Sequence, residues 1–275
     1  MLGFVAHCII FARQGALDAM KDLGEVMTPA VLGIVSHELR TPLAAIKGFT
    51  SLLLRHDGQL SAQERIEMLR EIDMAGDRLN NVIEHLLILA ELSTDAPQLA
   101  VQPVGIFLLV HDMLRQAEQR AQAVGDPPIT FTLNRPDTLP DEEPLLVSGD
   151  PHYLRLLLEE LLENACKFSP HGGAITVTLR LLADQSPFEP MYGGSPAPSR
   201  LLISVQDTGI GIPPEDLDRI FTPFFVVDNH LTRAAGGMGI GLALCRRIAE
   251  VHGMQIWAEN NNQQGSTFHL QLFLS

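Results

Sequence analysis

Two long amphipathic helices joined by a short loop are the feature that most constrains the fold of this 275-residue chain. Apolar residues recur at steps of three and four from Val31 to Leu53, and again from Ile66 to Ala90. This spacing places them along one face of each helix. Because only His56 to Leu60 separates the two patterns, we expect an antiparallel hairpin. One hairpin leaves much of so broad a stripe exposed, so the pairing of two copies into a four-helix bundle is the economical arrangement.

Local signals mark the starts of both predicted helices. Thr28 followed by Pro29 is typical of a helix start, with threonine as the N-cap and proline at the first helical position. The second helix opens with a capping box from Ser61 to Glu64. Pro42 lies inside the first helix, where it removes one backbone hydrogen bond and predicts a bend just after His37.

The sequence pattern changes beyond the proline-containing segment from Ser93 to Pro103. Helical and β-rich stretches then alternate, which predicts a mixed α/β domain with helices packed on one face of a sheet. The segment from Ala183 to Ser199 is rich in Pro, Gly and Ser and is predicted to be a mobile hairpin insertion. We expect helices over 107–123, 151–168 and 239–252, strands over 129–133, 145–147, 174–182 and 200–206, and two closing strands within 255–274.

Composition excludes several functional classes. A hydrophobic fraction of 46% indicates globular structure, and a formal net charge of −14 argues against nucleic acid and anionic membranes as partners. Cys8, Cys166 and Cys245 are odd in number and lack metal-ligand spacing, so a cytoplasmic location fits best. The apolar run from Met1 to Ala12 is too short to span a membrane and lacks the basic start of a signal peptide. We interpret residues 1–27 as the remnant of a sensory or signal-transmitting element, or the apolar run within them as a helix that pairs with a partner.

A reactive cluster lies in the first predicted helix, from Ser36 to Pro42. His37 and Thr41 are four residues apart and share a helix face, while Glu38 follows His37 directly and can hydrogen-bond the ring. A carboxylate bound to one ring nitrogen fixes the tautomer and raises the basicity of the imidazole. The pattern suits a nucleophilic histidine, and taken alone it suits an ordinary surface helix equally well.

Three segments of the second half point to a nucleotide, the first of them on a leucine-rich helix. Glu160, Asn164 and Lys167 fall at i, i+4 and i+7 and form one polar stripe. Carboxylate and amide oxygens suit a hard cation such as Mg²⁺, and an ammonium group suits phosphate. A solvated helix face is the alternative interpretation of this stripe.

The other two segments are rich in glycine. Asp207 follows a predicted strand, and its carboxylate could accept a hydrogen bond from an exocyclic amine such as N6 of adenine. Gly209 and Gly211, which come next, would let the backbone approach a ligand. The second cluster precedes a predicted helix, where free N–H groups favour phosphate, and comprises Gly236, Gly237, Gly239 and Gly241. No strand lies closely before it and no parallel βαβ unit follows, so a Rossmann dinucleotide site is excluded.

Taken in order, these motifs resemble those of the sensor histidine kinases of two-component signalling, over about Thr28 to Leu274. The resemblance implies a dimerisation and histidine-phosphotransfer hairpin over 28–95, a linker over 96–103, and an ATP-binding α/β sandwich of the GHKL class over 104–275. The matching stretches are Ser36–Pro42 for the H box, Asn164–Phe168 for the N box, Asp207–Gly211 for the first glycine box, Phe221–Phe225 for the F box, Gly237–Leu242 for the second glycine box and Gly265–Phe268 for the closing Gly-Thr motif.

The resemblance also implies roles for individual residues. His37 would be the phosphoacceptor, Glu38 the general base, and Thr41 would orient water for dephosphorylation of the regulator. ATP and Mg²⁺ would be the cofactors, and the partners would be a response-regulator receiver domain and a second copy of this chain. The implied ligand-binding residues are Asn164 for Mg²⁺, Lys167 for phosphate, Asp207 for adenine N6, Thr267 in the adenine pocket, and Phe168, Gly209, Gly211, Gly237, Gly239, Gly241 and Leu242 from the boxes.

Two positions depart from the family pattern. Glu160 stands where the N box usually opens with a second asparagine, as in GHKL ATPases whose glutamate activates water. We therefore predict that Glu160 is a Mg²⁺ ligand or adds some ATP hydrolysis. Val226 replaces an arginine that often follows the F box, and Arg233 either supplies the missing contact or belongs to a mobile lid.

The sequence thus predicts an ATP-dependent protein-histidine kinase that phosphorylates His37 and passes the phosphoryl group to an aspartate of a regulator. Two other functions remain open: a degenerate kinase that acts as a dimeric scaffold, and a plain GHKL ATPase. Intact motifs argue against the scaffold, and the hairpin that carries His37 has no purpose in a plain ATPase.

Overall fold

The computed structural model describes residues 29–56, 58–94, 97–124, 128–135, 145–182, 200–227, 237–262 and 264–274. The chain divides into two compact units, Met1–Asp95 and Ala96–Ser275. The predictions made for residues 1–28, for the insertion 183–199, and for Arg233 and Gly236 lie outside the described residues.

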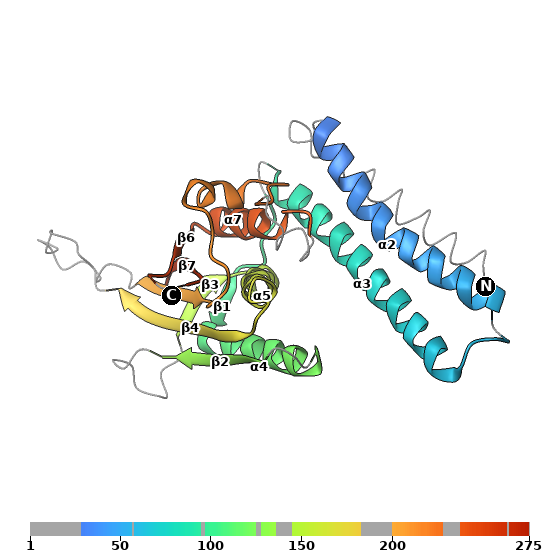
Figure 1. Cartoon of the computed structure of the whole chain (residues 1–275). Helices are drawn as coiled ribbons and strands as arrows, with labels where there is room; N and C mark the ends of the chain where they lie inside the picture. The colour runs from blue at the N-terminus through green and yellow to red at the C-terminus, as the bar shows by residue number, and fades with distance from the viewer. Residues whose placement is uncertain are drawn as a thin grey trace, which may run out of the picture. The chain divides into compact units, whose positions relative to one another are not determined.

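In the first unit, two long helices pack along each other as an antiparallel hairpin (Figure 1). They are α2 (Pro29–His56) and α3 (Ala62–Leu92), which confirms the helical prediction. The predicted capping box opens α3: the Glu64 N–H donates to Ser61 Oγ, and the Glu64 carboxylate accepts the Ser61 N–H. The hydrogen bonds from the Ser61 side chain and backbone lower the pKa of Glu64 below its usual value.

Pro42 is buried in the middle of α2, and the helix continues through it to His56. Since proline has no N–H, it cannot donate to the carbonyl oxygen four residues earlier, which belongs to Glu38. The proline therefore weakens the backbone ladder in the turn that carries the reactive cluster. The bend predicted after His37 stays a prediction.

The described hairpin buries only part of its apolar surface. Val35, Leu86 and Leu92 are fully buried. The exposed large apolar residues of the two helices are Leu32, Ile34, Leu52, Leu54, Ile66, Leu69, Met74 and Leu87. Several of these belong to the stripes seen in the sequence, so the single hairpin leaves an apolar face in contact with solvent.

The second unit is built on a five-stranded sheet with the strand order β2-β4-β5-β7-β6. Strand β2 runs parallel to β4, and the other neighbouring strands are antiparallel. A separate antiparallel pair joins β1 to β3. The strands of both sheets are β1 (Gln102–Gly105), β2 (Ile129–Asn134), β3 (Leu146–Gly149), β4 (Gly173–Leu182), β5 (Arg200–Gln206), β6 (Gln255–Asn260) and β7 (Ser266–Phe273).

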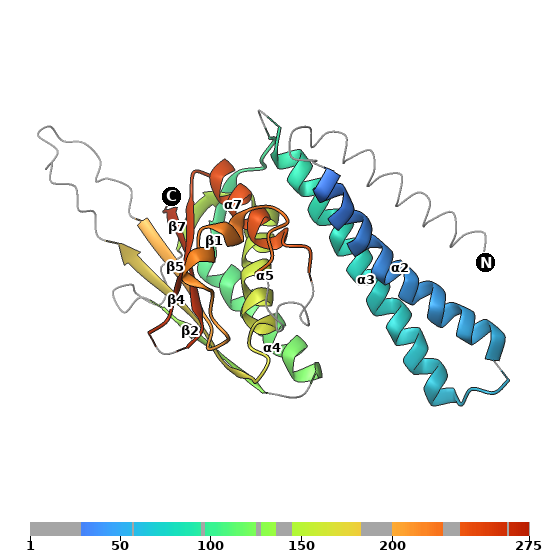
Figure 2. The same cartoon turned by 45° about the horizontal axis from the view of Figure 1, so that its top comes forward.

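Three helices cover one face of this sheet (Figure 2). They are α4 (Ile106–Val124), α5 (Pro151–Lys167) and α7 (Gly241–Val251). The core between the layers is aliphatic and includes Leu157, Leu161, Ile175, Ile203 and Leu244. Within the described ranges, none of the helices combines the length and the apolar character needed to span a bilayer.

The observed α/β layers agree with the predicted fold class, and the differences are small. Strand β1 begins at Gln102, inside the segment expected to be a linker. Its proline, Pro103, pairs with Ser148 in a two-stranded sheet, where proline is tolerated because every strand is an edge strand. Helix α7 begins at Gly241, two residues later than expected, because Gly239 has a positive φ of 69° that is incompatible with a helix.

Candidate functional site

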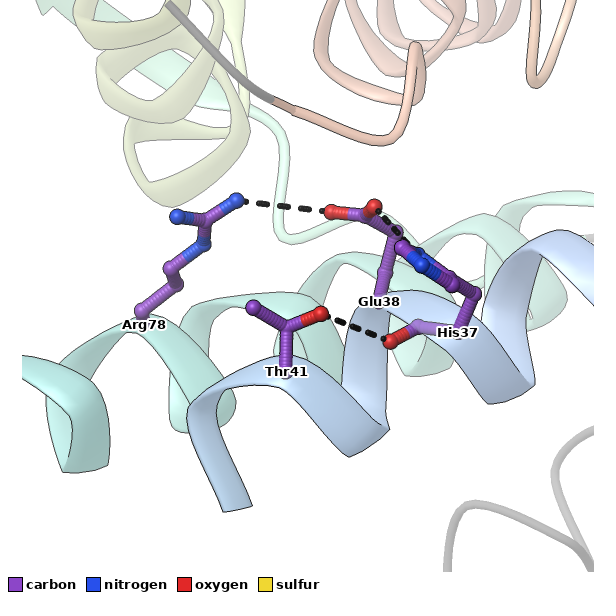
Figure 3. Close-up of polar contacts among 4 residues, drawn as sticks. All are labelled: His37, Glu38, Thr41 and Arg78. Atoms are coloured by element: carbon purple, nitrogen blue, oxygen red, sulfur yellow. Dashed lines mark hydrogen bonds and ion pairs between the residues drawn. The ribbon is translucent and has the colours of Figure 1, made fainter. Parts of the chain in front are cut away.

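The reactive cluster of the H box is formed on α2, where Figure 3 shows His37 and Glu38 side by side. His37 Nδ1 lies 3.3 Å from Glu38 Oε1. The side chain of His37 is 74% exposed, whereas that of Glu38 is 18% exposed. Buried Val35 shows which side of α2 faces the hairpin core, and His37, two residues later, points away from it. An imidazole that donates Nδ1–H to a carboxylate keeps its lone pair on Nε2, which is then the nucleophilic nitrogen.

Arg78 completes this cluster and was missed by the sequence analysis. It projects from α3, and its Nη2 lies 3.4 Å from Glu38 Oε2 (Figure 3). Glu38 therefore contacts the imidazole through one oxygen and a guanidinium through the other. Arg78 and Glu38 are 40 positions apart in the sequence. Their contact could have been predicted only by first aligning the two helices along their apolar stripes.

Thr41 lies one turn beyond His37, as the spacing predicts. Its hydroxyl donates to the His37 carbonyl oxygen over 3.2 Å, a common bond for threonine in helices. This contact keeps the hydroxyl beside the turn that carries the histidine. Its role in dephosphorylation stays a prediction.

The polar stripe of the N box lies on α5 and differs in exposure along its length. Glu160 is only 9% exposed, while Asn164 and Lys167 are partly exposed at the end of the helix. The Lys167 ammonium lies 5.1 Å from the centre of the Phe168 ring, a cation–π contact. Burial, with a smaller effect from the Glu163 charge, raises the pKa of Cys166 to about 11. A raised pKa favours the thiol over the thiolate, which disfavours a nucleophilic role for Cys166.

Asp207 lies just beyond the end of β5 and is 2% exposed. Its Oδ1 accepts the N–H groups of Gly209, at 2.8 Å, and Ser266, at 3.1 Å. Its Oδ2 accepts the Ser266 hydroxyl over 2.6 Å. A carboxylate has about four acceptor positions, so these bonds fix the group and leave capacity for an exocyclic amine.

Ser266 is a site residue that the sequence patterns did not single out, whereas its neighbour Thr267 was predicted to lie in the adenine pocket. Successive residues of a strand point to opposite faces of the sheet, so only one of the two can reach Asp207 directly. The Thr267 hydroxyl donates instead to Asn261 Oδ1 over 2.6 Å. Asn261 Nδ2 in turn donates to the Asp207 carbonyl oxygen, so Thr267 is linked to Asp207 only through Asn261.

The glycine boxes are places where one motif packs closely against another. A Cβ atom at Gly209 would overlap the carbonyl oxygen of Phe168 in the N box. A Cβ atom at Gly241 would overlap the Glu160 carboxylate, and one at Gly237 would lie 2.6 Å from Lys167 Nζ. At Gly209 the close atom is backbone, so a side chain there would separate the N box from the first glycine box; at Gly241 and Gly237 the Glu160 and Lys167 side chains would have to move. Leu242, the last predicted residue of this box, is half-buried in the first turn of α7.

The F box is held between two arginines. Arg246 of α7 lies 4.4 Å from the centre of the Phe221 ring, and Arg219 lies 4.3 Å from that of Phe225. The Phe224 N–H donates to the Gly239 carbonyl oxygen over 2.9 Å and so joins the F box to the second glycine box. Val226, at the position where the family often has arginine, is exposed. The two arginines that stack on the F-box rings lie before it, at Arg219, and on α7, at Arg246.

The residues fit a Mg²⁺ ion that is bound together with phosphate oxygens. Magnesium keeps several waters and usually takes only one or two protein oxygens at nucleotide sites. Asn164 offers an amide oxygen on the exposed side of α5, and Glu160 offers a carboxylate one turn earlier. Among the described residues there is no cluster of three or more His, Cys, Asp and Glu side chains.

Two family models match the chain. The His Kinase A (phospho-acceptor) domain matches residues 30–95. The histidine kinase-, DNA gyrase B- and HSP90-like ATPase family matches residues 149–275. The two matches contain the hairpin and the nucleotide-site motifs, respectively.

Similar proteins carry the same pair of regions within longer chains. The circadian input-output histidine kinase CikA of Synechococcus elongatus is 34% identical over 241 residues, which is 86% of this chain and 29% of that protein. The sensor protein GacS of Pseudomonas syringae and the aerobic respiration control sensor protein ArcB of Escherichia coli are each 32% identical over 96% of this chain. This chain spans 26% of the length of GacS and 31% of the length of ArcB.

Solved structures support the same fold. Full-length ShkA in complex with AMPPNP has a TM-score of 0.59 and 28% identity, over 90% of this chain and 47% of that one. The histidine kinase AdeS of Acinetobacter baumannii has a TM-score of 0.61 over 87% of this chain and 98% of that one, and its 20% identity supports the fold alone.

Proposed function

Because this chain belongs to the sensor histidine kinases of two-component systems, we propose that it transfers the γ-phosphoryl group of ATP to His37. The observation that carries the proposal is the exposed imidazole whose Nδ1 contacts Glu38, which makes Nε2 the nucleophile. The Nε2 lone pair forms the N–P bond while the bond from phosphorus to the β,γ-bridging oxygen breaks, and ADP leaves. Glu38 accepts the Nδ1 proton as the ring becomes charged.

The nucleotide would be held by the N box and the two glycine boxes. We assign the adenine N6 amine to Asp207 Oδ2, with Ser266 fixing the carboxylate. Lys167 would contact phosphate, as would the backbone of Gly237, Gly239 and Gly241 ahead of α7. Phe168, Gly209, Gly211, Leu242 and Thr267 would shape the pocket around these contacts.

Asn164 would hold Mg²⁺, which when bound neutralises charge on the phosphates. Glu160 is the second metal-ligand candidate, and its carboxylate also lies against the start of α7 at Gly241. If Glu160 holds the metal or activates water, Glu160→Gln will change the kinase or ATPase rate. Equal rates in this variant and the wild-type chain would refute that role.

The phosphoryl group would then pass to an aspartate of a response-regulator receiver domain. Thr41, which lies beside the His37 turn, would orient water when the kinase dephosphorylates that regulator. The exposed apolar face of the hairpin supports pairing of two copies into a four-helix bundle. We place the reaction in the cytoplasm, where ATP is available.

The deciding experiment incubates the purified chain with γ-labelled ATP and Mg²⁺. Phosphohistidine is acid-labile and stable in alkali, so the label should be lost in acid. His37→Gln should incorporate no label, because it has no nucleophilic imidazole. Acid-stable label, or equal labelling of His37→Gln, would contradict the proposal.

The same experiment separates the two other functions. A degenerate scaffold would neither bind ATP nor become labelled. A plain ATPase would release labelled phosphate without forming a phosphoprotein, and its rate would not change in His37→Gln. We favour the kinase because the hairpin displays His37 with a base beside it, which neither of the other functions uses.

A further inference from the structure

Two consecutive asparagines at the end of β6 hold the backbone that carries Asp207. Asn261 Nδ2 donates to the Asp207 carbonyl oxygen over 2.7 Å. Asn260 Oδ1 accepts the Ile212 N–H over 2.8 Å, and its Nδ2 donates to the Ile212 carbonyl oxygen. We call this pair, Asn260 and Asn261, the asparagine clasp. It binds Asp207, where the first glycine box begins, and Ile212, directly after the box ends; the box itself is a loop without regular structure.

The clasp supplies a hydrogen-bond donor to a backbone carbonyl oxygen just beyond the end of β5. Strand β5 ends at Gln206, so the Asp207 carbonyl oxygen lies beyond the β5–β7 ladder and takes the Asn261 amide as its donor. The Asp207 N–H is bound on its other side by the Ser266 carbonyl oxygen, at 2.9 Å. Both backbone polar groups of Asp207 are therefore satisfied, one by Asn261 in the turn after β6 and the other by Ser266 at the start of β7.

The hydrogen bonds define which way the Asn261 amide faces. Its oxygen accepts the Thr267 hydroxyl over 2.6 Å. Its nitrogen faces the carbonyl oxygens of Asp207, Gln264, at 3.1 Å, and Ser266, at 3.4 Å. Carbonyl oxygens can only accept, so the group that faces them must be a donor. An aspartate of the same shape would instead place a negative oxygen against them.

Close packing leaves little room for the loop to shift. Gly265 has a positive φ of 88°, and a Cβ atom there would overlap the Asp207 carbonyl oxygen. A Cβ atom at Gly211 would lie 3.3 Å from Asn260 Oδ1. The turn and the loop thus meet backbone to backbone, with the two asparagine amides between them.

We propose that the asparagine clasp is a positioning device for base selectivity, in which Asn261 holds Asp207 where its carboxylate can accept the adenine amine. The clasp acts on the nucleotide through Asp207. This inference rests on the proposed function, because it takes Asp207 to be the adenine-binding residue. It assigns a task to Thr267 as well, which orients the Asn261 amide.

The test measures dissociation constants of the full chain for ATP and for inosine triphosphate, which has an oxygen in place of the adenine amine. The variant Asn261→Asp keeps the shape and replaces the donor by an acceptor. We expect ATP affinity to fall about tenfold, with a smaller change for inosine triphosphate, so that selectivity decreases. Where labelling is measurable, KM for ATP should rise while kcat is retained.

Asn262→Asp is the matched control, since it adds the same charge one residue later at an exposed position. It should retain both affinity and selectivity. Thr267→Val removes only the hydroxyl that orients Asn261 and should weaken selectivity in the same direction, while Thr267→Ser should restore it. If Asn261→Asp does not fold, as judged by thermal melting, the two Thr267 variants decide the question.

Unchanged selectivity in Asn261→Asp, or an equal loss for both nucleotides, would overturn the clasp and leave the proposed function intact. A wild-type chain that binds the two nucleotides equally would overturn the assignment of Asp207 and the clasp together. Binding is measured directly, so failure of histidine phosphorylation alone would count against the kinase proposal and not against the clasp.

Discussion

The two halves of the candidate machinery are built in opposite ways. His37, Glu38 and Thr41 lie within five consecutive residues of α2, and the histidine is largely exposed. The nucleotide residues come from α5, from the ends of β5 and β6, and from the start of α7, and Asp207 at their centre is 2% exposed. The first site needs one helix for these three residues and the hairpin only for Arg78, whereas the second exists only when the whole sheet unit has folded.

This difference decides how each site tolerates change. On α2 the spacing of side chains sets the geometry, so a substitution acts through the chemistry of the group that it replaces. In the sheet unit, glycines let backbone segments touch, so the addition of one methyl group can displace a motif.

The largest effect is expected for Gly209→Ala. The added Cβ would overlap the Phe168 carbonyl oxygen, which is backbone and cannot rotate away, so the N box and the first glycine box would separate. We expect ATP binding and histidine labelling to become undetectable. Calorimetric titration with ATP, with a thermal melt to show that the hairpin is still folded, checks this; normal ATP affinity would contradict the close packing.

The next largest effect is expected for Glu38→Gln. The amide can still contact His37 but cannot take its proton, so the labelling rate should fall about a hundredfold or more. KM for ATP should be unchanged, because the nucleotide residues belong to the other unit. Glu84→Gln, at an exposed position on α3, is the control. A rise in KM with normal kcat would show that Glu38 serves binding and not proton transfer.

The sequence could predict the local site because its evidence is local. Helical spacing places His37, Glu38 and Thr41 together, and the capping box at Ser61 fixes where α3 begins. The paired helices, the alternating strands and the sheet layers also follow from hydrophobic periodicity. Motif order then predicts that Asp207 and Asn164 bind the nucleotide and its metal.

The sequence could not predict contacts that depend on register. Arg78 reaches Glu38 only because the packing of the hairpin fixes the register of α3 against α2. The Ser266 side chain, and not that of Thr267, contacts Asp207 because side chains alternate between the two faces of β7. A shift of one residue in the register of β7 would exchange the two. Asn261 reaches Asp207 across 54 residues of sequence, through a turn whose shape no local pattern encodes.

A moderate effect is expected for Arg78→Ala. The guanidinium is 49% exposed and its contact with Glu38 is 3.4 Å long, so it orients the base without being essential. The labelling rate should fall about fivefold, with KM for ATP unchanged. Arg78→Lys should recover part of the rate because it keeps the charge, and Arg70→Ala on the same helix should have no effect. If the labelling rate of the Arg78 variants falls only in step with a lower melting temperature, the role of Arg78 is structural.

The smallest effect, and the sharpest contrast with Gly209, is expected for Gly48→Ala. Gly48 is exposed within α2, and nothing in the described hairpin lies within 4 Å of an added Cβ. Alanine favours the helix over glycine, so the free energy of unfolding should rise by about 0.5–1 kcal/mol, with the labelling rate unchanged. Chemical denaturation followed by helical circular dichroism measures this. A decrease in stability would mean that another surface packs against α2 at Gly48, as the Phe168 backbone packs against Gly209. The contrast between the two units would then disappear.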